Sequence, residues 1–152
     1  MRIVVAGSSG LIGSALVLRL EAAGHQVVRL VRPGGAEQGI PWDPAAGAIA
    51  AAALEGADAV VNLAGRSIGE RRWDEAERRL LRESRVGSTA LLAGALAGLR
   101  RPPGVLLNAS AVGYYGNRPG EALDESSRAG TGFFPELCAA WEAAAAPVAA
   151  AG

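Results

Sequence analysis

The feature that most constrains the fold is a set of three evenly spaced glycines directly after an apolar segment at the start of the chain. Residues 2–6 are rich in β-branched side chains, and Gly7, Gly10 and Gly13 follow at intervals of three. Such a run is typical of a buried parallel strand, and the apolar spacing from Leu11 onward indicates a helix. In a strand-to-helix turn, Gly7 permits the sharp turn, Gly10 lets a pyrophosphate approach the backbone, and Gly13 lets the helix pack closely. The alternative is a tight turn that binds no nucleotide, and the glycines alone leave it open.

A second strand is expected at Gln26–Val31, and the residue after it bears on which nucleotide the turn accepts. Sites for NAD place Asp or Glu at this strand end to bind the ribose 2′-hydroxyl, whereas sites for NADP place Arg near the 2′-phosphate. Here Val31 is followed by Arg32 and then by Pro33, with no carboxylate. Arg32 therefore favours NADP, because a guanidinium matches the geometry of a phosphate. A solvated loop arginine is the alternative.

The remaining pattern predicts an α/β protein with a Rossmann-like, doubly wound parallel sheet and helices on both faces. Residues 33–47 are rich in Gly, Pro and Ala, which predicts a loop-dominated edge with one short edge strand at Ile40–Asp43. The other expected elements are a short helix at residues 49–54, a parallel strand at 59–63, a mostly helical region at 66–101, a buried strand at Val105–Asn108 and a final helix at 133–146. If the strand order is 3-2-1-4-5, Val105–Asn108 becomes an edge that invites self-association.

Composition narrows the classes of function. The chain has 152 residues, the length of one domain, and half of them are hydrophobic. Fifteen basic residues, all arginine, balance fifteen acidic ones, so no net field attracts nucleic acid or an anionic membrane. One Cys and one His are too few to form a structural zinc site or a disulfide. No apolar run reaches membrane-spanning length. The first expected strand begins directly after Met1, which leaves no room for a signal peptide. We expect a cytoplasmic protein with a small-molecule substrate, no metal, no nucleic-acid partner and no membrane association.

Motifs along nearly the whole chain carry a family resemblance. They are residues 7–13, 24–25, 42–44, 56–65, 72–73, 84–85, 110–116 and 141–142. In these stretches the sequence resembles the atypical short-chain dehydrogenases/reductases of the NAD-dependent epimerase/dehydratase-like family, and in particular the epimerase family proteins of the 39U class. The resemblance implies a Rossmann-like fold that binds a nicotinamide cofactor, NADPH in particular, with a substrate that is unassigned for the group.

The resemblance also implies which residues hold the cofactor. It places phosphate contacts in the glycine turn, the 2′-phosphate contact on Arg32, and a helix contact on Arg85, where ordinary extended members have Asn. The full implied set is Gly7, Gly10, Leu11, Ile12, Gly13, Arg32, Leu63, Ala64, Gly65 and Arg85. Because family members continue well beyond this length, residues 1–152 are expected to be the NADP-binding domain without the substrate-binding C-terminal half, or a shortened open reading frame.

The expected catalytic residues depart from the family pattern. Ordinary superfamily members use a Tyr, made acidic by a Lys four residues later, as proton donor or acceptor. The matching positions are Phe134 and Cys138, and the chain contains no Lys. Ser110, at a strand end, is the candidate to hydrogen-bond the substrate oxygen, with satisfaction of the turn as the alternative. Cys138 is a candidate weak acid or a buried space-filler, and Tyr114 and Tyr115 are alternative acids.

Two functions remain open at this point. The first is an NADP(H)-dependent oxidoreductase or epimerase-like enzyme in which the cofactor carries the hydride chemistry and the protein positions the reactants. The second is a non-catalytic NADPH-binding or redox-sensing module, which the missing Tyr and Lys favour.

Overall fold

A six-stranded sheet forms the centre of the computed structural model, which describes residues 1–34 and 38–150. The strands are β1 (Arg2–Ala6), β2 (Gln26–Val31), β3 (Ile40–Asp43), β4 (Ala48–Ile49), β5 (Ala59–Asn62) and β6 (Val105–Asn108). Their order is β4-β3-β2-β1-β5-β6, and every neighbouring pair is parallel except β3 and β4. Without β4 this is the predicted order 3-2-1-4-5, so the Rossmann-like fold class is confirmed.

The hairpin of β3 and β4 corrects the prediction for one edge of the sheet. Ile40–Asp43 is not the edge strand, because β4 pairs outside it with Trp42 opposite Ile49. The Asp43 carboxylate accepts a hydrogen bond from the backbone N–H of Ala45 at 3.1 Å, and Gly47 at φ +65° completes the reversal. Aspartate and glycine are residues that favour such turns. Residues 35–37 of the predicted loop lie outside the described residues.

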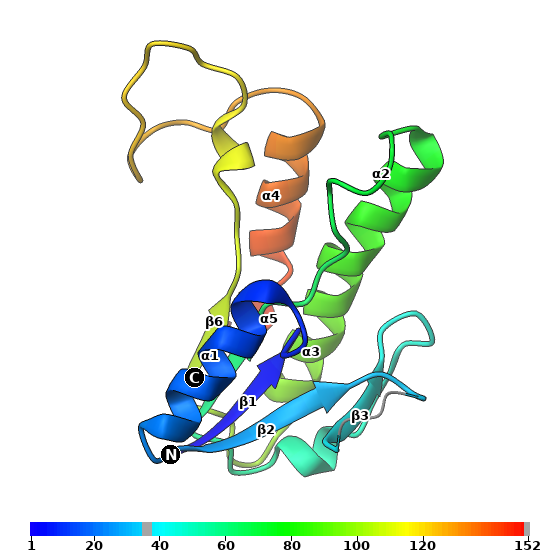
Figure 1. Cartoon of the computed structure of the whole chain (residues 1–152), viewed down its shortest axis with the longest axis vertical. Helices are drawn as coiled ribbons and strands as arrows, with labels where there is room; N and C mark the ends of the chain where they lie inside the picture. Colours follow the sequence, from blue (N-terminus) through cyan, green and yellow to red (C-terminus); the bar gives the residue numbers. More distant parts are fainter. Residues whose placement is uncertain (35–37, 151–152) are drawn as a thin grey trace.

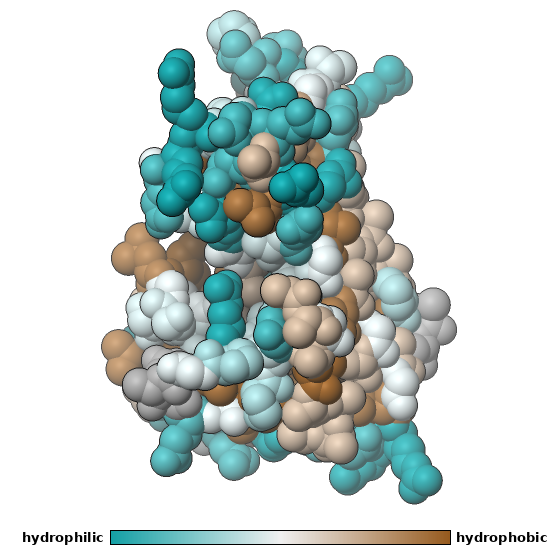
Figure 2. All heavy atoms as spheres, turned by 90° about the vertical axis from the view of Figure 1, so that its right-hand side faces the viewer, coloured by the Kyte–Doolittle hydropathy of each residue, from teal (hydrophilic) through white to brown (hydrophobic). Residues whose placement is uncertain are grey.

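Some helices cover the faces of this sheet, and others extend beyond the ends of its strands (Figure 1). They are α1 (Leu11–Ala22), the 3₁₀ helix η1 (Ala51–Leu54), α2 (Glu75–Arg82), the π-helical segment η2 (Glu83–Gly87), α3 (Ser88–Ala97), the 3₁₀ helix η3 (Val112–Tyr115), α4 (Phe133–Ala143) and α5 (Ala146–Ala150). Elements α2, η2 and α3 follow one another without a break. This helical region begins at Glu75 and not at residue 66 as predicted, because Asp74 caps α2: its carboxylate accepts a hydrogen bond from the Glu77 N–H at 2.8 Å. Figure 2 shows hydrophilic side chains gathered over the end of the molecule that carries α2.

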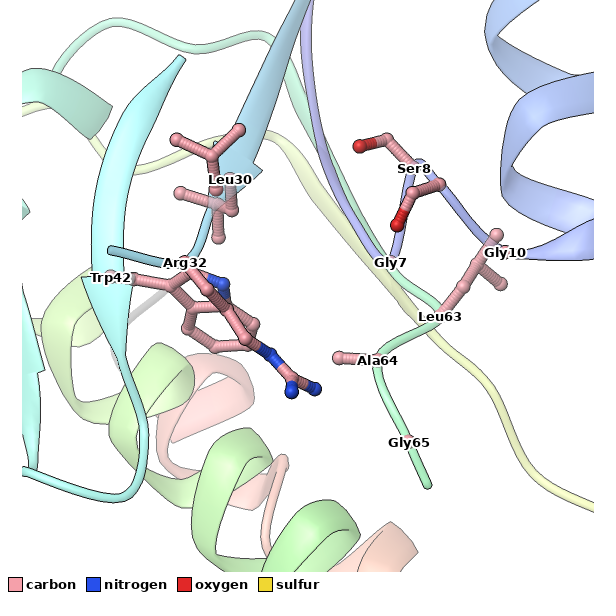
Figure 3. A pocket seen from close by; sticks show the side chains of 11 residues that line it. Gly7, Ser8, Gly10, Leu30, Arg32, Trp42, Leu63, Ala64 and Gly65 are labelled. Atoms are coloured by element: carbon pink, nitrogen blue, oxygen red, sulfur yellow. The ribbon is translucent and has the colours of Figure 1, made fainter. Parts of the chain in front are cut away.

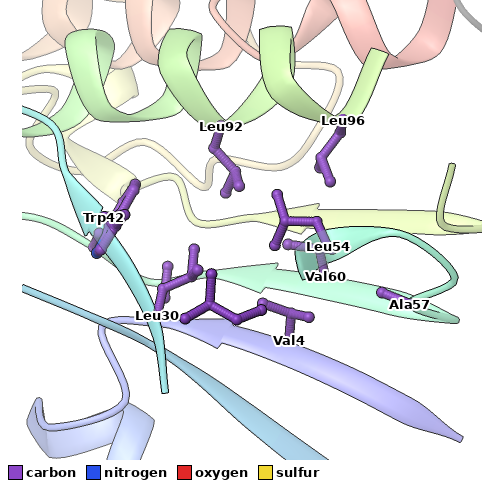
Figure 4. Close-up of a cluster of buried hydrophobic side chains, with 11 residues drawn as sticks. Val4, Leu30, Trp42, Leu54, Ala57, Val60, Leu92 and Leu96 are labelled. Atoms are coloured by element: carbon purple, nitrogen blue, oxygen red, sulfur yellow. The ribbon is translucent and has the colours of Figure 1, made fainter. Parts of the chain in front are cut away.

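Alternate residues of β1 enter two cores on opposite faces of the sheet. Val4 belongs to the core under α3, where Leu92 and Leu96 point towards the strands (Figure 4). Val5 belongs to the other core, with Val17 of α1. A strand buried on both faces is typical of the middle of a parallel sheet, and it holds the glycine turn after β1 on a rigid support.

The β6 edge of the sheet exposes apolar surface and gives the first testable prediction. Val105 is 41% exposed and Leu107 is 58% exposed. Because an edge strand offers backbone groups for pairing, we expect the chain to self-associate, and Leu107→Arg to shift it towards monomer in light scattering. Leu18→Arg, at a 66% exposed site on α1, is the control and should leave the oligomeric state unchanged. A wild-type chain that stays monomeric at every concentration would contradict this prediction.

Candidate functional site

The glycine turn lies between the carboxyl ends of β1 and β5, and two of its glycines are required by the protein itself. Gly7 has φ +77°, and a Cβ on it would lie 2.7 Å from the backbone carbonyl carbon of Leu63. A Cβ on Gly13 would lie 2.1 Å from the Gly7 carbonyl oxygen. Both distances are far below van der Waals contact, so a side chain at either position would collide with the backbone. Only glycine therefore allows the turn to lie this close to the end of β5 and to the start of α1.

Gly10 differs because the protein leaves room beside it. Its φ is −75°, and a Cβ there would meet its nearest atom, the Gly7 carbonyl oxygen, at 3.4 Å. Gly10 is the N-cap of α1 and supplies no side-chain cap to the helix. The first backbone N–H groups of a helix have no intrahelical partner, and they carry the positive end of the helix dipole. The start of α1, where Leu11 and Ile12 are 92% and 69% exposed, is therefore suited to an anion that passes close to Gly10.

A first cleft of about 520 Å³ opens on one side of this turn. Its lining residues are Gly7, Ser8, Ser9, Gly10, Leu30, Val31, Arg32, Trp42, Leu63, Ala64 and Gly65. Arg32 extends from the end of β2 into the cleft, in the direction of Ala64 (Figure 3). Among residues 1–34 and 38–150, no carboxylate forms an ion pair with Arg32. The first cleft thus offers a cation at one end and backbone N–H groups at the other.

A second cleft of about 600 Å³ lies on the other side of the turn and shares Gly7, Gly10 and Leu63 with the first. Its apolar and aromatic lining comprises Leu11, Ile12, Leu63, Ile68, Trp73, Val112, Phe134, Leu137 and Trp141. Trp73 and Phe134 meet edge to face with ring centroids 4.6 Å apart. Two clefts that meet at a helix N-terminus can hold the two halves of an elongated ligand whose anionic centre lies at the turn.

Arg85 reaches the wall of the second cleft from the π-helical segment η2. π-Helical turns inside α-helices recur at functional sites because they redirect a side chain. The Arg85 guanidinium donates to the backbone carbonyl of Arg66 at 2.9 Å and lies 5.3 Å from the centroid of the Trp141 ring. Burial lowers the pKa of Arg85, because desolvation disfavours the charged form. Arg85 thus brings a half-buried cation to an otherwise apolar wall.

Ser110 and Cys138, the two predicted catalytic residues, both line the second cleft. The Ser110 hydroxyl is hydrogen-bonded to the carboxylate of Glu142. Burial raises the pKa of the Cys138 thiol and Glu142 raises it further, so this thiol is a poor acid. Tyr114 and Tyr115, the alternative acids, meet edge to face with ring centroids 5.3 Å apart, and neither residue lines the first or the second cleft.

A buried polar network joins the ends of β5 and β6 to α3 and α4, and it was not predicted from the sequence. The Asn62 amide donates to Thr89 Oγ1 at 2.9 Å and to Asn108 Oδ1 at 2.7 Å, while its oxygen accepts from the Ala64 N–H at 3.2 Å. The Trp141 indole also donates to Thr89, at 2.9 Å. These bonds fix the strand ends relative to α3 and α4. The only signal in the sequence was an Asn at the end of each strand.

Two kinds of feature are absent from the part of the chain that the structure describes. No three side chains of the His, Cys, Asp or Glu type approach one another closely enough there to hold a metal ion. Nor does any helix of these ranges have both the length and the apolar character needed to cross a bilayer.

Comparison with known proteins identifies relatives of the chain. A sequence model of the NAD dependent epimerase/dehydratase family matches residues 3–135. Epimerase family protein Mb2239 of Mycobacterium bovis is 48% identical over 149 residues, which is 95% of this chain and 48% of that protein. The chain thus spans about half the length of the curated relatives it matches.

Solved structures agree with this assignment. The crystal structure of human epimerase family protein SDR39U1 (isoform 2) with NADPH superposes with a TM-score of 0.84 and 38% identity, over 95% of this chain and 48% of that one. A nucleoside-diphosphate sugar epimerase from Corynebacterium glutamicum superposes with a TM-score of 0.82 and 38% identity, over 100% of this chain and 32% of that one.

Proposed function

The chain belongs to the NAD-dependent epimerase/dehydratase family, and we propose that residues 1–152 form a domain that binds NADP(H) for an oxidoreductase or epimerase-like reaction. The observation that carries this proposal is the guanidinium of Arg32 in the first cleft, at the end of β2, which forms no ion pair with a carboxylate of residues 1–34 and 38–150. A crystal structure of the human relative contains NADPH, which supports the same choice of cofactor.

The residues of the two clefts fit such a cofactor. The start of α1 offers backbone N–H groups to the pyrophosphate, and the missing side chain of Gly10 leaves space for it. Arg32 would bind the 2′-phosphate as a planar fork. Leu63, Ala64 and Gly65 would lie along the centre, and Arg85 beside the second cleft would hold the nicotinamide half.

The chain's own residues would then position the reactants. When bound, NADP(H) supplies or accepts the hydride. Ser110 would donate a hydrogen bond to the substrate oxygen, and the apolar walls of the second cleft, including Trp73 and Phe134, would exclude water from it. The substrate is a small molecule that carries a hydroxyl or carbonyl group.

A second candidate is a non-catalytic NADPH-binding or redox-sensing module. Phe134 and Cys138 favour it, because a phenyl ring exchanges no proton and the pKa of the buried thiol is raised.

Binding of NADPH is the experiment that tests the proposal. We expect NADPH to raise the midpoint of thermal unfolding, because a ligand of the native state must stabilise it, and to bind more tightly than NADH. Arg32→Ala should weaken NADPH about ten- to a hundred-fold and leave NADH unchanged, since it removes charge-assisted bonds to a phosphate that NADH lacks. Arg19→Ala, at an exposed site in the last turn of α1, is the matched control. Equal affinities of the native chain for both cofactors would contradict the assignment of Arg32.

A further inference from the structure

Three residues of α4 form a row that faces residues 110–113, which follow β6 and include the start of η3. Phe134, Cys138 and Glu142 are spaced by four residues, so they lie on one side of the helix. A Cβ on Gly113 would lie 3.3 Å from the Cβ of Phe134. The same Cβ would lie 3.9 Å from Cys138 Sγ, and Glu142 is hydrogen-bonded to Ser110. The first two positions are those of the missing Tyr and Lys, and the third carries a carboxylate.

The other polar groups on the wall of the second cleft are already engaged or unsuited to proton transfer. The indole N–H groups of Trp73 and Trp141 donate to the Ile68 carbonyl at 2.8 Å and to Thr89 at 2.9 Å. Arg85 has only hydrogen-bond donors. This leaves the hydroxyl of Ser110, whose partner is a carboxylate that can take up a proton.

We propose that Glu142, hydrogen-bonded to Ser110, is a positioning residue that supplies the proton acceptor of the second cleft in place of the missing Tyr and Lys. The inference rests on the proposed function. In the oxidation of an alcohol, the carbon gives up hydrogen with two electrons as hydride to the oxidised cofactor. The hydroxyl proton passes to Ser110 Oγ, and the Ser110 proton passes to Glu142. The products are a carbonyl compound, the reduced cofactor and a protonated Glu142.

Two titratable groups near Glu142, the Cys138 thiol and the Arg85 guanidinium, keep a fixed charge beside it. Cys138, one turn earlier on α4, stays a neutral thiol because its pKa is raised. Arg85 faces Cys138 from η2 and stays a cation, because a guanidinium keeps its charge in proteins. The Glu142 carboxylate, hydrogen-bonded to the cleft residue Ser110, would therefore favour the cationic ring of NADP⁺ over the neutral ring of NADPH.

Binding of NADP⁺ and NADPH to the full chain tests the inference without a known substrate. Glu142→Gln, which keeps the shape and removes the charge, should weaken NADP⁺ about five-fold and leave NADPH unchanged. Ser110→Ala should weaken NADP⁺ in the same direction, because it releases the carboxylate. Glu136→Gln, at an exposed site in the first turn of α4, is the control and should change neither affinity.

The outcomes separate the inference from the function on which it rests. If both cofactors bind and Glu142→Gln affects them equally, Glu142 has only a structural role and the inference is wrong. If neither cofactor binds the wild-type chain, the proposed function fails and the inference fails with it.

Discussion

Alanine at Gly13 is expected to destabilise the protein by about 1 to 3 kcal/mol, the cost of forcing a methyl group into a packed site. The new Cβ would lie 2.1 Å from the Gly7 carbonyl oxygen and 2.9 Å from the Ser8 Cα. Both are backbone atoms, so no side-chain rotation relieves the contact, and either the turn or the start of α1 must shift. Thermal unfolding should show a midpoint lower by about 3 to 10 °C for a domain of this size.

Serine at Gly10 is the matched comparison, because it separates folding from binding. Gly10 has an ordinary φ of −75° and space for a Cβ, and serine is a favoured N-cap residue. Gly10→Ser should keep the unfolding midpoint at or slightly above that of the wild type, yet abolish the stabilisation by NADPH, since the side chain occupies the path of the pyrophosphate. A Gly10→Ser variant that binds NADPH normally would show that the ligand does not pass over this turn.

Local patterns explain why the core of the fold and the first cleft could be predicted from the sequence. The β-branched run before Gly7 and the three glycines specify strand, turn and helix within thirteen residues. Arg32 follows directly from the end of β2, which the register places beside β1. For such features, neighbours in the chain are neighbours in space, so spacing alone is informative.

The features that escaped prediction depend on contacts between distant parts of the chain. The π-helical turn that carries Arg85 lies in a sequence with the pattern of an ordinary helix, and the network around Asn62 joins residues up to 52 positions apart. The bond between Ser110 and Glu142 spans 32 positions. Neither propensity nor periodicity reports which strand end a helix face will meet, so these contacts required the structure.

The proposed pair of Ser110 and Glu142 also predicts a direction for the chemistry. A carboxylate only accepts hydrogen bonds, so in that form Glu142 can take up a proton and has none to donate. Oxidation of a hydroxyl suits this pair, whereas reduction of a ketone needs an acid. Phe134 and Cys138 do not supply one, because the ring has no exchangeable proton and the pKa of the buried thiol is raised.

With ordinary ketones and NADPH, the native chain is therefore expected to turn over about 10² to 10⁴ times more slowly than the double variant Phe134→Tyr/Cys138→Lys, which rebuilds the acid of ordinary superfamily members. The pKa of the Cys138 thiol already responds to both Arg85 and Glu142, so a lysine at position 138 would lie between these two groups. It would pair with the Glu142 carboxylate, and its positive charge would lower the pKa of the new tyrosine.

Phe133→Tyr/Cys138→Lys is the matched control, because Phe133 does not line the second cleft and the hydroxyl of a tyrosine there would not reach the substrate. The single variant Phe134→Tyr, which leaves the buried Cys138 in place, separates the effect of the hydroxyl from any loss of folding caused by the lysine. If the native chain already reduces simple ketones at the rates of ordinary dehydrogenases, the proton has another source, and the view of Phe134 and Cys138 as a depleted catalytic couple is wrong.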